Sequence, residues 1–417
     1  MTRVLFVGID PGMKRHEVCF LDPEGQQIGR FRRFDNSRSG AQDLQKAILE
    51  VCRAGDFDRV RIATEATSVY DFHVLEFLAD WAREAPAFLE VYRLNARQVA
   101  RFKGSFPDDH KTDARDAFVI ADRLRFGRLP QPYQPADART ALQRLTRFRF
   151  HLARAIAAEK NYFLVQLFLK FSAYAAEKPF SDPFGATRVA VIEDFVEADD
   201  ILRTPPEELL TYLQDKGKCR FPDPEKVADT LRRVARESYR LRPNINESVN
   251  LVLALTHRNL RALGASLKEV DKAIADAFAA FHTTLQTVPG IGPVYAAGLF
   301  AEIGYCERYA DNTRVARHAG LAWKTRQSVD FSADETPSLR GANRYLRYYL
   351  VEAANTVRQH EPDYRAFYRK KHAEARQHAH KRALVLTARK LVRLVFRLLK
   401  YGELYRSPHR RRTNAHA

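Results

Sequence analysis

Short apolar runs alternate with amphipathic stretches over the first 135 residues, and this pattern predicts a layer of strands and helices. An apolar run over 3–9 ends in an Asp-Pro-Gly turn, and a second run over 16–21 follows at the spacing of a β-hairpin. Hydrophobic periodicity and turn residues predict the remaining elements, which are strands over 27–34, 59–63 and 88–92 and helices over 41–54, 72–81 and 113–126. Three hairpin-like strands followed by alternating helices and strands are typical of an α/β or α+β layer.

The next 150 residues are predicted to be mainly helical. Residues 137–178 and 227–282 carry apolar positions at helical spacing, and their imperfect heptads leave a coiled coil and a plain helical bundle both open. Prolines break the chain near 180–226 into short helices and loops. Two long helices on either side of such an insert would return antiparallel and form a stalk.

A glycine-rich turn and a basic helix characterise the last third. Residues 285–297 resemble the hairpin of a helix-hairpin-helix module, whose backbone N–H groups can bind a phosphate, although an ordinary corner between two helices has the same glycines. The periodicity predicts helices over 315–321, 343–357 and 381–401, with a polar loop over 323–339. Seven apolar residues of the last helix lie on one face.

The charge of the chain favours a polyanionic partner. The net charge is +18 and the pI is about 9.8, so nucleic acid is the leading candidate. Between residues 381 and 412 there are eleven Lys or Arg residues and one acidic residue, which favours phosphate contact over a merely solvated face. No apolar run is long enough to span a membrane, and the four cysteines form no pair of metal-ligand or disulfide type. We therefore expect a cytoplasmic protein with no membrane partner.

Acidic residues at element ends indicate metal chemistry. Asp10 and Glu65 follow apolar strands, and Asp113 and Asp116 lie three apart on one face of a predicted helix. Four carboxylates can hold two Mg²⁺ or Mn²⁺ ions and stabilise a displacement at phosphorus. A solvated first turn is the alternative for the Asp pair. Competing acids are assigned to turns or to the surface, namely Asp22, Asp56, Asp58, Asp71, Asp108, Asp109 and Asp122.

Several segments resemble the DEDD motif of the insertion-sequence 110 family of transposases. The match lies in residues 7–10, 64–67 and 111–117, and residues 285–303, 319–328, 341–347 and 383–399 resemble the family's C-terminal domain. The resemblance implies a RuvC-like, RNase H-like domain over 1–135, whose topology the predicted strand order also fits. It further implies a coiled-coil stalk over 136–282, a mainly helical transposase domain over 283–405 and a basic tail over 406–417. The expected fold class is therefore α/β plus all-α.

The resemblance also implies the chemistry. Ser328 would attack a DNA phosphate and form a covalent phosphoserine link, with strand exchange guided by a structured noncoding bridge RNA. Val329 stands where the family usually has Gly, and Ser332 and Ser338 are the alternative nucleophiles. No Ser-His-Asp arrangement is readable near Ser328, so we expect its activation to come from the acidic domain. The predicted nucleic-acid contacts are Lys111, Arg326, Arg340, Asn343, Arg344, Arg347, Lys381, Arg389, Lys390 and Arg393.

We therefore expect a transposase that excises and inserts a mobile element. Its expected partners are donor DNA, target DNA and the bridge RNA, and it would act at the bacterial nucleoid as a homodimer or homotetramer. The first alternative is a RuvC-like, metal-dependent nuclease that cuts branched DNA with water. The second is a catalytically silent protein that only binds RNA or DNA.

Overall fold

The computed structural model describes residues 3–66, 69–106, 112–180, 184–217, 222–322, 327–328, 331–332 and 342–407. The chain divides into two compact units, Met1–Asp137 and Ala138–Ala417. The first unit ends within two residues of the boundary that the sequence predicts. Within the described residues, no helix is both long enough and apolar enough to cross a membrane.

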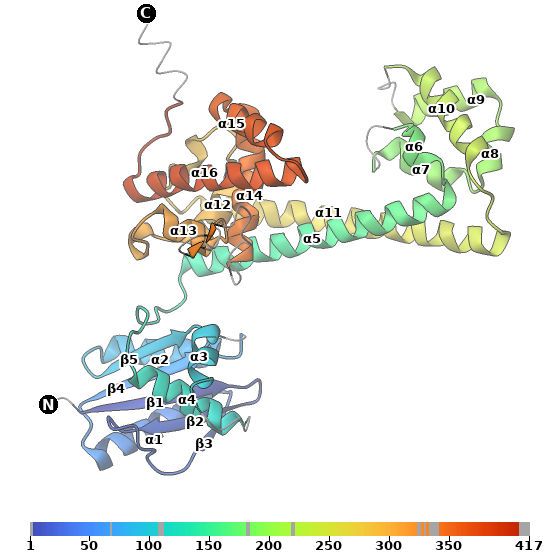
Figure 1. The fold of residues 1–417 in the computed structure, drawn as a ribbon. Coiled ribbons are helices and arrows are strands. Elements are labelled where there is room, and N and C mark those ends of the chain that lie inside the picture. The colour runs from blue at the N-terminus through green and yellow to red at the C-terminus, as the bar shows by residue number, and fades with distance from the viewer. Residues whose placement is uncertain are drawn as a thin grey trace, which may run out of the picture. The chain divides into compact units, whose positions relative to one another are not determined.

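The N-terminal unit is built on a mixed five-stranded sheet (Figure 1). Its strands are β1 (Val4–Pro11), β2 (Arg15–Leu21), β3 (Arg32–Asp35), β4 (Arg59–Glu65) and β5 (Leu89–Leu94), in the order β3-β2-β1-β4-β5. The first three strands are antiparallel neighbours, whereas β4 and β5 run parallel to β1. This arrangement confirms the expected α/β, RNase H-like sheet. The third strand is shorter than predicted and begins only at Arg32. Among the preceding residues that were predicted to belong to it, Gln27 forms an isolated bridge to Leu21.

Helices cover both faces of this sheet. Helices α1 (Arg38–Gly55) and α2 (Phe72–Glu84) pack on the face that carries Leu5, Val7 and Ile9. Helix α4 (Asp113–Arg125) packs on the opposite face, and α3 (Ala96–Lys103), which the sequence analysis did not predict, lies against α4. Successive residues of a strand point to opposite faces, so odd residues of β1 pack under α1 and α2 while even residues face α4.

Gly8 lets α4 cross closely over β1. A Cβ atom at Gly8 would lie 2.1 Å from the carbonyl oxygen of Ala117 and 2.4 Å from the amide nitrogen of Ala121. Both contacts are with helix backbone, so any side chain at Gly8 would push α4 away from the strand. The close approach places the first turn of α4 beside the end of β1.

Replacing Gly8 with alanine is expected to destabilise the N-terminal unit by about 1–3 kcal/mol, because α4 must shift to admit the methyl group. Urea unfolding followed by circular dichroism measures this loss. Gly104→Ala is the matched control, since its Cβ would meet the carbonyl oxygen of Arg101 at an ordinary 3.5 Å and its φ is −66°. Equal stability of the two variants would contradict the close crossing.

The second unit begins with an antiparallel pair of long helices, α5 (Ala138–Lys170) and α11 (Pro243–Phe278) (Figure 1). An ion pair between Arg149 and Asp271 and a hydrogen bond from Asn259 to Glu159 fix their register. The expected two-helix stalk is therefore present, while its coiled-coil character stays a prediction.

An all-helical insert joins the ends of the two stalk helices. It contains α6 (Tyr174–Glu177), α7 (Ala186–Asp194), α8 (Ala198–Arg203), α9 (Pro206–Gly217) and α10 (Pro224–Glu237). The helical region predicted over 227–282 is present and is interrupted just before Pro243, but its first part, α10, packs on α8 and α9 of the insert, so the second stalk helix begins only at Pro243. Periodicity shows that a segment is helical, but it does not show which neighbour its apolar face covers.

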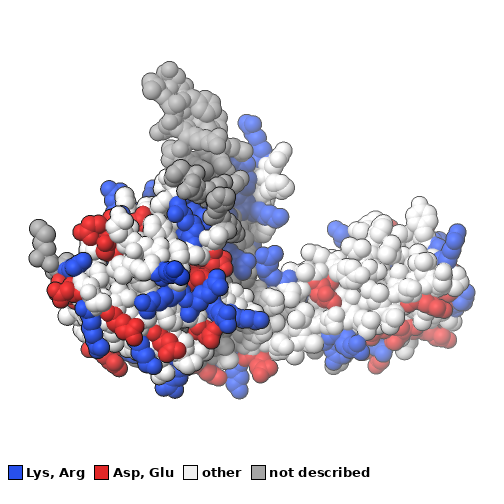
Figure 2. All heavy atoms as spheres, turned by 90° about the horizontal axis from the view of Figure 1, so that it is seen from below, with Lys and Arg blue, Asp and Glu red and all other residues white. Residues whose placement is uncertain are grey.

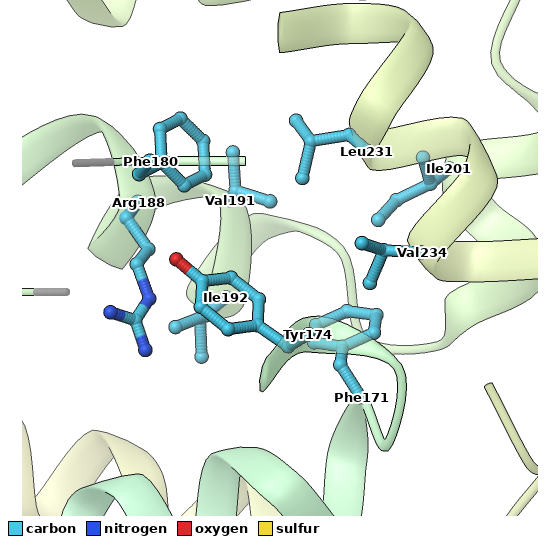
Figure 3. Close-up of a pocket in the computed structure, with 9 residues that line it drawn as sticks. All are labelled: Phe171, Tyr174, Phe180, Arg188, Val191, Ile192, Ile201, Leu231 and Val234. Carbon is cyan, nitrogen blue, oxygen red and sulfur yellow. The ribbon is translucent and has the colours of Figure 1, made fainter. Parts of the chain in front are cut away.

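Aliphatic and aromatic side chains together form the core of this insert (Figure 3). The side chain of Arg188 is fully buried there, and its guanidinium lies 4.3 Å from the ring centre of Tyr174. The cavity beside them measures only about 10 Å³, which is the size of one water molecule. This part of the insert is therefore a packed core and offers no ligand site.

The C-terminal body packs around the base of the stalk. Its elements are η1 (Leu285–Thr287), α12 (Pro293–Ile303), η2 (Cys306–Arg308), α13 (Asn312–His318), the hairpin β6 (Gln327–Ser328) and β7 (Phe331–Ser332), α14 (Arg344–His360), α15 (Pro362–Ala373) and α16 (Ala379–Tyr401). Leu142, Ile274 and Phe278 of the stalk belong to the same hydrophobic core as α12, α14 and α16. The stalk and the C-terminal body, predicted as separate domains, therefore share one core.

Two predicted features of this body have clear structural counterparts. The apolar face of α16 is buried, as predicted, through residues such as Ala388, Leu391 and Val395. The glycine-rich turn contains Gly290 at a φ of 94°, where its carbonyl oxygen accepts a hydrogen bond of 2.6 Å from the Thr356 hydroxyl. Its assignment as a helix-hairpin-helix module stays a prediction.

Candidate active site

Three carboxylates lie side by side where the central strands end. Asp10 of β1 pairs with Glu17 of β2, and the register of Ile9 with Thr64 puts Glu65 of β4 on its other side. All three residues occupy the strand positions that face α4. The sheet therefore aligns Asp10 and Glu65, as the sequence predicts, and adds Glu17, which the sequence analysis did not single out.

The first turn of α4 supplies the other two predicted acids. The Thr112 hydroxyl caps this helix by accepting a hydrogen bond of 3.2 Å from the amide of Arg115, and Asp113 and Asp116 follow within one turn. Burial, together with the charges of Asp116, Asp113 and Glu17, raises the pKa of Asp10 to about 6. Burial, followed by the charges of Asp10 and Asp116, also raises the pKa of Glu65. The structure thus brings all four predicted acids into one electrostatic cluster.

Lys103 is a basic member of this cluster that the sequence analysis missed. It lies at the end of α3, and its ammonium group donates to the carboxylate of Asp116. Its charge also opposes the rise in the pKa values of Asp10 and Glu65. Asn95, which caps α3 through a hydrogen bond from the Arg97 amide, is the sequence signal that could have revealed this helix.

The cluster has the chemistry of a divalent-cation site. Burial, followed by repulsion between the carboxylates, raises the pKa values of Asp10 and Glu65, and the positive charge of Lys103 opposes this rise. Hard cations such as Mg²⁺ prefer carboxylate oxygens. Among the described residues, no three His, Cys, Asp or Glu side chains are already gathered as metal ligands. The residue types fit a divalent cation, and its binding would draw the carboxylates together.

Asp10→Asn is expected to stabilise the metal-free protein at pH 7.5 and to have little effect near pH 4. The folded state holds the Asp10 proton more tightly than the unfolded chain, because the folded pKa of about 6 exceeds the ordinary value. Raising the pH between these values therefore costs stability, and this cost is on the order of 1 kcal/mol. Urea unfolding in EDTA at a series of pH values measures it.

Addition of Mg²⁺ supplies the control for this experiment. At pH 7.5 the cation is expected to stabilise the wild-type protein more than the Asn variant, because binding relieves the repulsion between carboxylates. A stability difference that is independent of both pH and Mg²⁺ would contradict the coupling among the acids.

Asp71 corrects one sequence assignment, since it was placed in a turn or on the surface and is instead fully buried. Its carboxylate accepts hydrogen bonds from Arg93 of β5 at 2.5 and 2.9 Å. The hydroxyl of Thr64 lies 3.4 Å from the same carboxylate. This pair joins α2 to the sheet on the face opposite the acidic cluster. The sequence could not reveal it because the partners are 22 positions apart and belong to different elements.

Ser328 lies at the end of β6, in a two-residue antiparallel pairing with β7. The described residues that precede this hairpin are hydrogen-bonded to the described residues that follow it. The amide of Asn343 donates to the carbonyl of His318 at 2.7 Å, and Arg347 donates to the carbonyl of Gly320 at 2.6 Å. The predicted nucleophile therefore belongs to a segment whose two ends are held together.

A buried polar network supports this junction. The side chain of Glu302 is fully buried and accepts hydrogen bonds from Arg147 at 2.7 and 3.0 Å and from the side-chain amide (Nδ2) of Asn343 at 2.6 Å. Asn343 also caps α14 by accepting from the amides of Tyr345 and Leu346. Its side chain thus serves the fold, and its predicted contact with nucleic acid is untested.

The other predicted nucleic-acid residues differ in exposure. Arg344, Lys381 and Arg393 are exposed. Lys390 is half-buried and donates to the carbonyl of Asp363, and Arg389 is half-buried beside Asn312. Lys111, Arg326 and Arg340, as well as the alternative nucleophile Ser338, lie outside the described residues.

Two family models match the chain. Residues 7–171 match the DEDD model of IS110 transposases, which carries the description "Transposase". Residues 282–369 match the model described as the transposase of the IS116/IS110/IS902 family. The two matches contain all four acids of the cluster and the Ser328 hairpin.

Curated relatives span nearly the same length. An uncharacterized 44.8 kDa protein of insertion element IS116 from Streptomyces clavuligerus is 28% identical over 96% of this chain and 96% of its own. An uncharacterized 42 kDa protein of IS900 from Mycobacterium paratuberculosis is 25% identical over 97% of this chain and 98% of its own. Among solved structures, T. thermophilus RuvC in complex with a Holliday junction substrate is similar at 16% identity, over 32% of this chain and 100% of that chain, with a TM-score of 0.23. Because models of one family match both parts of the chain in the order of its motifs, the chain belongs to the IS110 family of transposases, enzymes that cleave and rearrange DNA.

Proposed function

We propose that this transposase exchanges DNA strands through a covalent link between Ser328 and a DNA phosphate, under the guidance of a structured RNA. One observation carries the proposal. The N-terminal unit has a cluster of carboxylates suited to a divalent cation, and the second unit has a hairpin that contains Ser328 and is held at both ends. A covalent intermediate conserves the energy of the phosphodiester bond, so rejoining needs no external energy source.

Asp10, Glu65, Asp113 and Asp116 would hold Mg²⁺ or Mn²⁺. When bound, the metal supplies Lewis-acid stabilisation of the negative charge that develops on the phosphate. The carboxylates orient the site from the edge of a rigid sheet and the start of a helix. Lys103 balances part of their charge through Asp116.

Ser328 would supply the nucleophile. Its hydroxyl loses its proton as the oxygen forms a new bond to phosphorus, the bond from phosphorus to one sugar oxygen breaks, and that sugar oxygen takes up a proton. The reverse step rejoins the strand. Hydrogen bonds to the carbonyls of His318 and Gly320 hold the two ends of the hairpin segment together, so the segment that carries the serine is anchored at both ends. Exposed Arg344, Lys381 and Arg393 are suited to hold the DNA backbone.

The surface charge fits a protein that contacts nucleic acid at several places. Figure 2 shows Lys and Arg side chains interspersed with Asp and Glu side chains rather than separated from them on this face. The whole chain has a net charge of +18, which suits a protein that binds nucleic acid.

Purification from the native host tests the guidance by RNA. Nucleic acid that copurifies with the full-length protein is extracted, treated with DNase or RNase, and sequenced. We expect one specific structured RNA, encoded beside the gene. Random cellular RNA, or none, would contradict the guided mechanism while leaving the serine chemistry open to its own test.

The stalk offers a surface for self-association with a second copy of the chain. Exposed apolar side chains line its far half, and we call them the stalk patch: Tyr162, Val165, Phe168 and Leu169 of α5 with Leu251 and Leu255 of α11. The antiparallel register brings Phe168 level with Leu251. An exposed apolar surface of this kind marks an interaction site.

Phe168→Asp combined with Leu251→Asp is expected to weaken self-association by about 100-fold or more, because each change removes an apolar side chain worth about 1.5–3 kcal/mol when buried and about 1.4 kcal/mol corresponds to a tenfold change in affinity. Sedimentation velocity across protein concentrations measures the shift. Tyr239→Asp is the matched control, since Tyr239 is 84% exposed and lies outside the patch. An unchanged assembly in the double variant would exclude the stalk patch as the contact.

A metal-dependent nuclease acting on branched DNA is the second candidate. The observation that favours it is that the acidic cluster has enough carboxylates to hold divalent cations, so a reaction with water would not need Ser328. Such an enzyme would cut with water and form no protein-DNA adduct, so covalent trapping separates the two candidates.

A further inference from the structure

His16 lies at the same end of the sheet as the acidic cluster but faces the other way. It pairs with Pro11, the residue after Asp10. Glu17 faces α4 and the acids, whereas His16, like Val18 and Phe20, faces α1 and α2. The imidazole is only 2% exposed, and its Nδ1 atom has no hydrogen-bond partner.

The state of this imidazole follows from its surroundings. Burial lowers the pKa of His16, so the ring is neutral near pH 7. His16 is hydrogen-bonded to the side chain of Asn36, whose amide nitrogen already donates to the carbonyls of Gly12 and Tyr70. Asn36 can therefore only accept from His16. The imidazole proton is thus directed to Asn36, and Nδ1 is a buried acceptor that needs a donor.

An open pocket of about 530 Å³ lies against this histidine. His16, Ala41 and Val74 are its buried lining residues, and Phe77 is half-buried beside them. The exposed lining residues include Arg38, Gln42, His73 and Asp80. The pocket thus combines a buried acceptor, aromatic rings and charged groups of both signs at its rim.

The start of α1 gives one side of the pocket a preference for anions. This helix is 18 residues long, and its first turn contains no acidic residue. The dipole of the helix attracts negative charge at this end, and Arg38 adds a cation at the same position. On the other side, the pocket is lined by the exposed ring of His73 and the half-buried ring of Phe77, and bases stack on aromatic rings of this kind.

We propose that this pocket receives one unstacked nucleotide from a nucleic-acid strand that passes the acidic cluster. The phosphate lies at the start of α1 beside Arg38, the base lies against His73 and Phe77, and an N–H group of the base or a sugar hydroxyl donates to Nδ1 of His16. The inference rests on the proposed function in that the chain must bind nucleic acid. It adds a second site, for one nucleotide, on the face of the sheet opposite the acidic cluster.

Photocrosslinking of the full-length protein tests the pocket. The probes are two single strands of one sequence, an RNA with 4-thiouridine and a DNA with 4-thiothymidine, and mass spectrometry locates each adduct. We expect adducts on His73 or Phe77. Arg38→Glu is expected to lower their yield by about tenfold, because it removes the phosphate contact and adds a repulsive charge.

The control is Arg53→Glu, which makes the same charge change at the other end of α1 and is expected to leave the yield unchanged. His16→Leu, checked for normal thermal unfolding, is expected to reproduce the loss seen with Arg38→Glu. Adducts with the RNA alone would assign the pocket to a guide strand, and adducts with the DNA alone to a substrate strand, and either result supports the site.

Two results would overturn the inference. If both probes bind but crosslink only elsewhere, the pocket is not a nucleotide site, while the proposed function stands. If neither probe binds at all, the proposed function fails and the pocket assignment fails with it.

Discussion

Replacing Ser328 with alanine is expected to abolish the covalent protein-DNA adduct and to lower strand exchange by a factor on the order of 10⁴ or more, as the loss of a nucleophile does in other enzymes. No other group in the proposed mechanism can form the bond to phosphorus. The measurement uses end-labelled DNA carrying the recombination site, followed by denaturing electrophoresis, in which an adduct moves as protein-linked label.

Ser332→Ala provides the matched control, because Ser332 lies in the same hairpin, where it pairs with Gln327. The control variant is expected to retain the adduct. If Ser332→Ala loses it and Ser328→Ala keeps it, the nucleophile is the neighbouring serine. Cutting by the wild-type protein without any adduct would instead favour the nuclease that uses water.

Asp116→Asn is expected to lower strand cleavage by about 10³, since a carboxylate of the metal site contributes several kcal/mol to stabilising the charge at phosphorus. The change keeps the size of the side chain, so α4 should fold normally. Single-turnover cleavage in saturating Mg²⁺ measures the loss, and circular dichroism confirms the helix content.

Asp122→Asn, on the same helix, is the control for this change. The carboxylate of Asp122 accepts a hydrogen bond of 2.8 Å from Arg125 and lies two turns after the acidic first turn, so cleavage is expected to stay within about twofold of wild type. Unchanged cleavage in Asp116→Asn would remove this carboxylate from catalysis. Unchanged activity in Asp10→Ala as well would favour a protein that only binds nucleic acid.

Much of the N-terminal unit could be predicted from local pattern. The strand over residues 3–9, the strand that ends at Glu65 and the helix that begins at Asp113 all lie where periodicity and capping residues put them. The alternation of a strand decides which face a residue occupies, so Asp10 and Glu65 had to share a face once their strands were adjacent and in register. The two errors of prediction, the length of the third strand and the omission of α3, lie where the local sequence signal is weak.

The extent of the helical insert required the tertiary structure. Helix α10 has the same periodicity as a stalk helix, but its apolar residues cover α8 and α9. Likewise, the stalk base could not be separated from the C-terminal body by pattern, because Phe278 packs against Phe300 of α12. A hydrophobic stripe shows that a face is buried, and only the assembled chain shows what buries it.

For individual polar and charged residues, too, some roles could be predicted from the sequence and others required the tertiary structure. The sequence by itself determined the alternating faces of the strands, because these depend on short-range geometry, and its resemblance to a family picked out the four acids of the DEDD motif. The tertiary structure decided that Lys103 joins the acids, that Asp71 is a buried partner of Arg93, and that His16 borders a pocket. Such partners are brought together by long-range packing, which sets the distance and desolvation on which charge interactions depend.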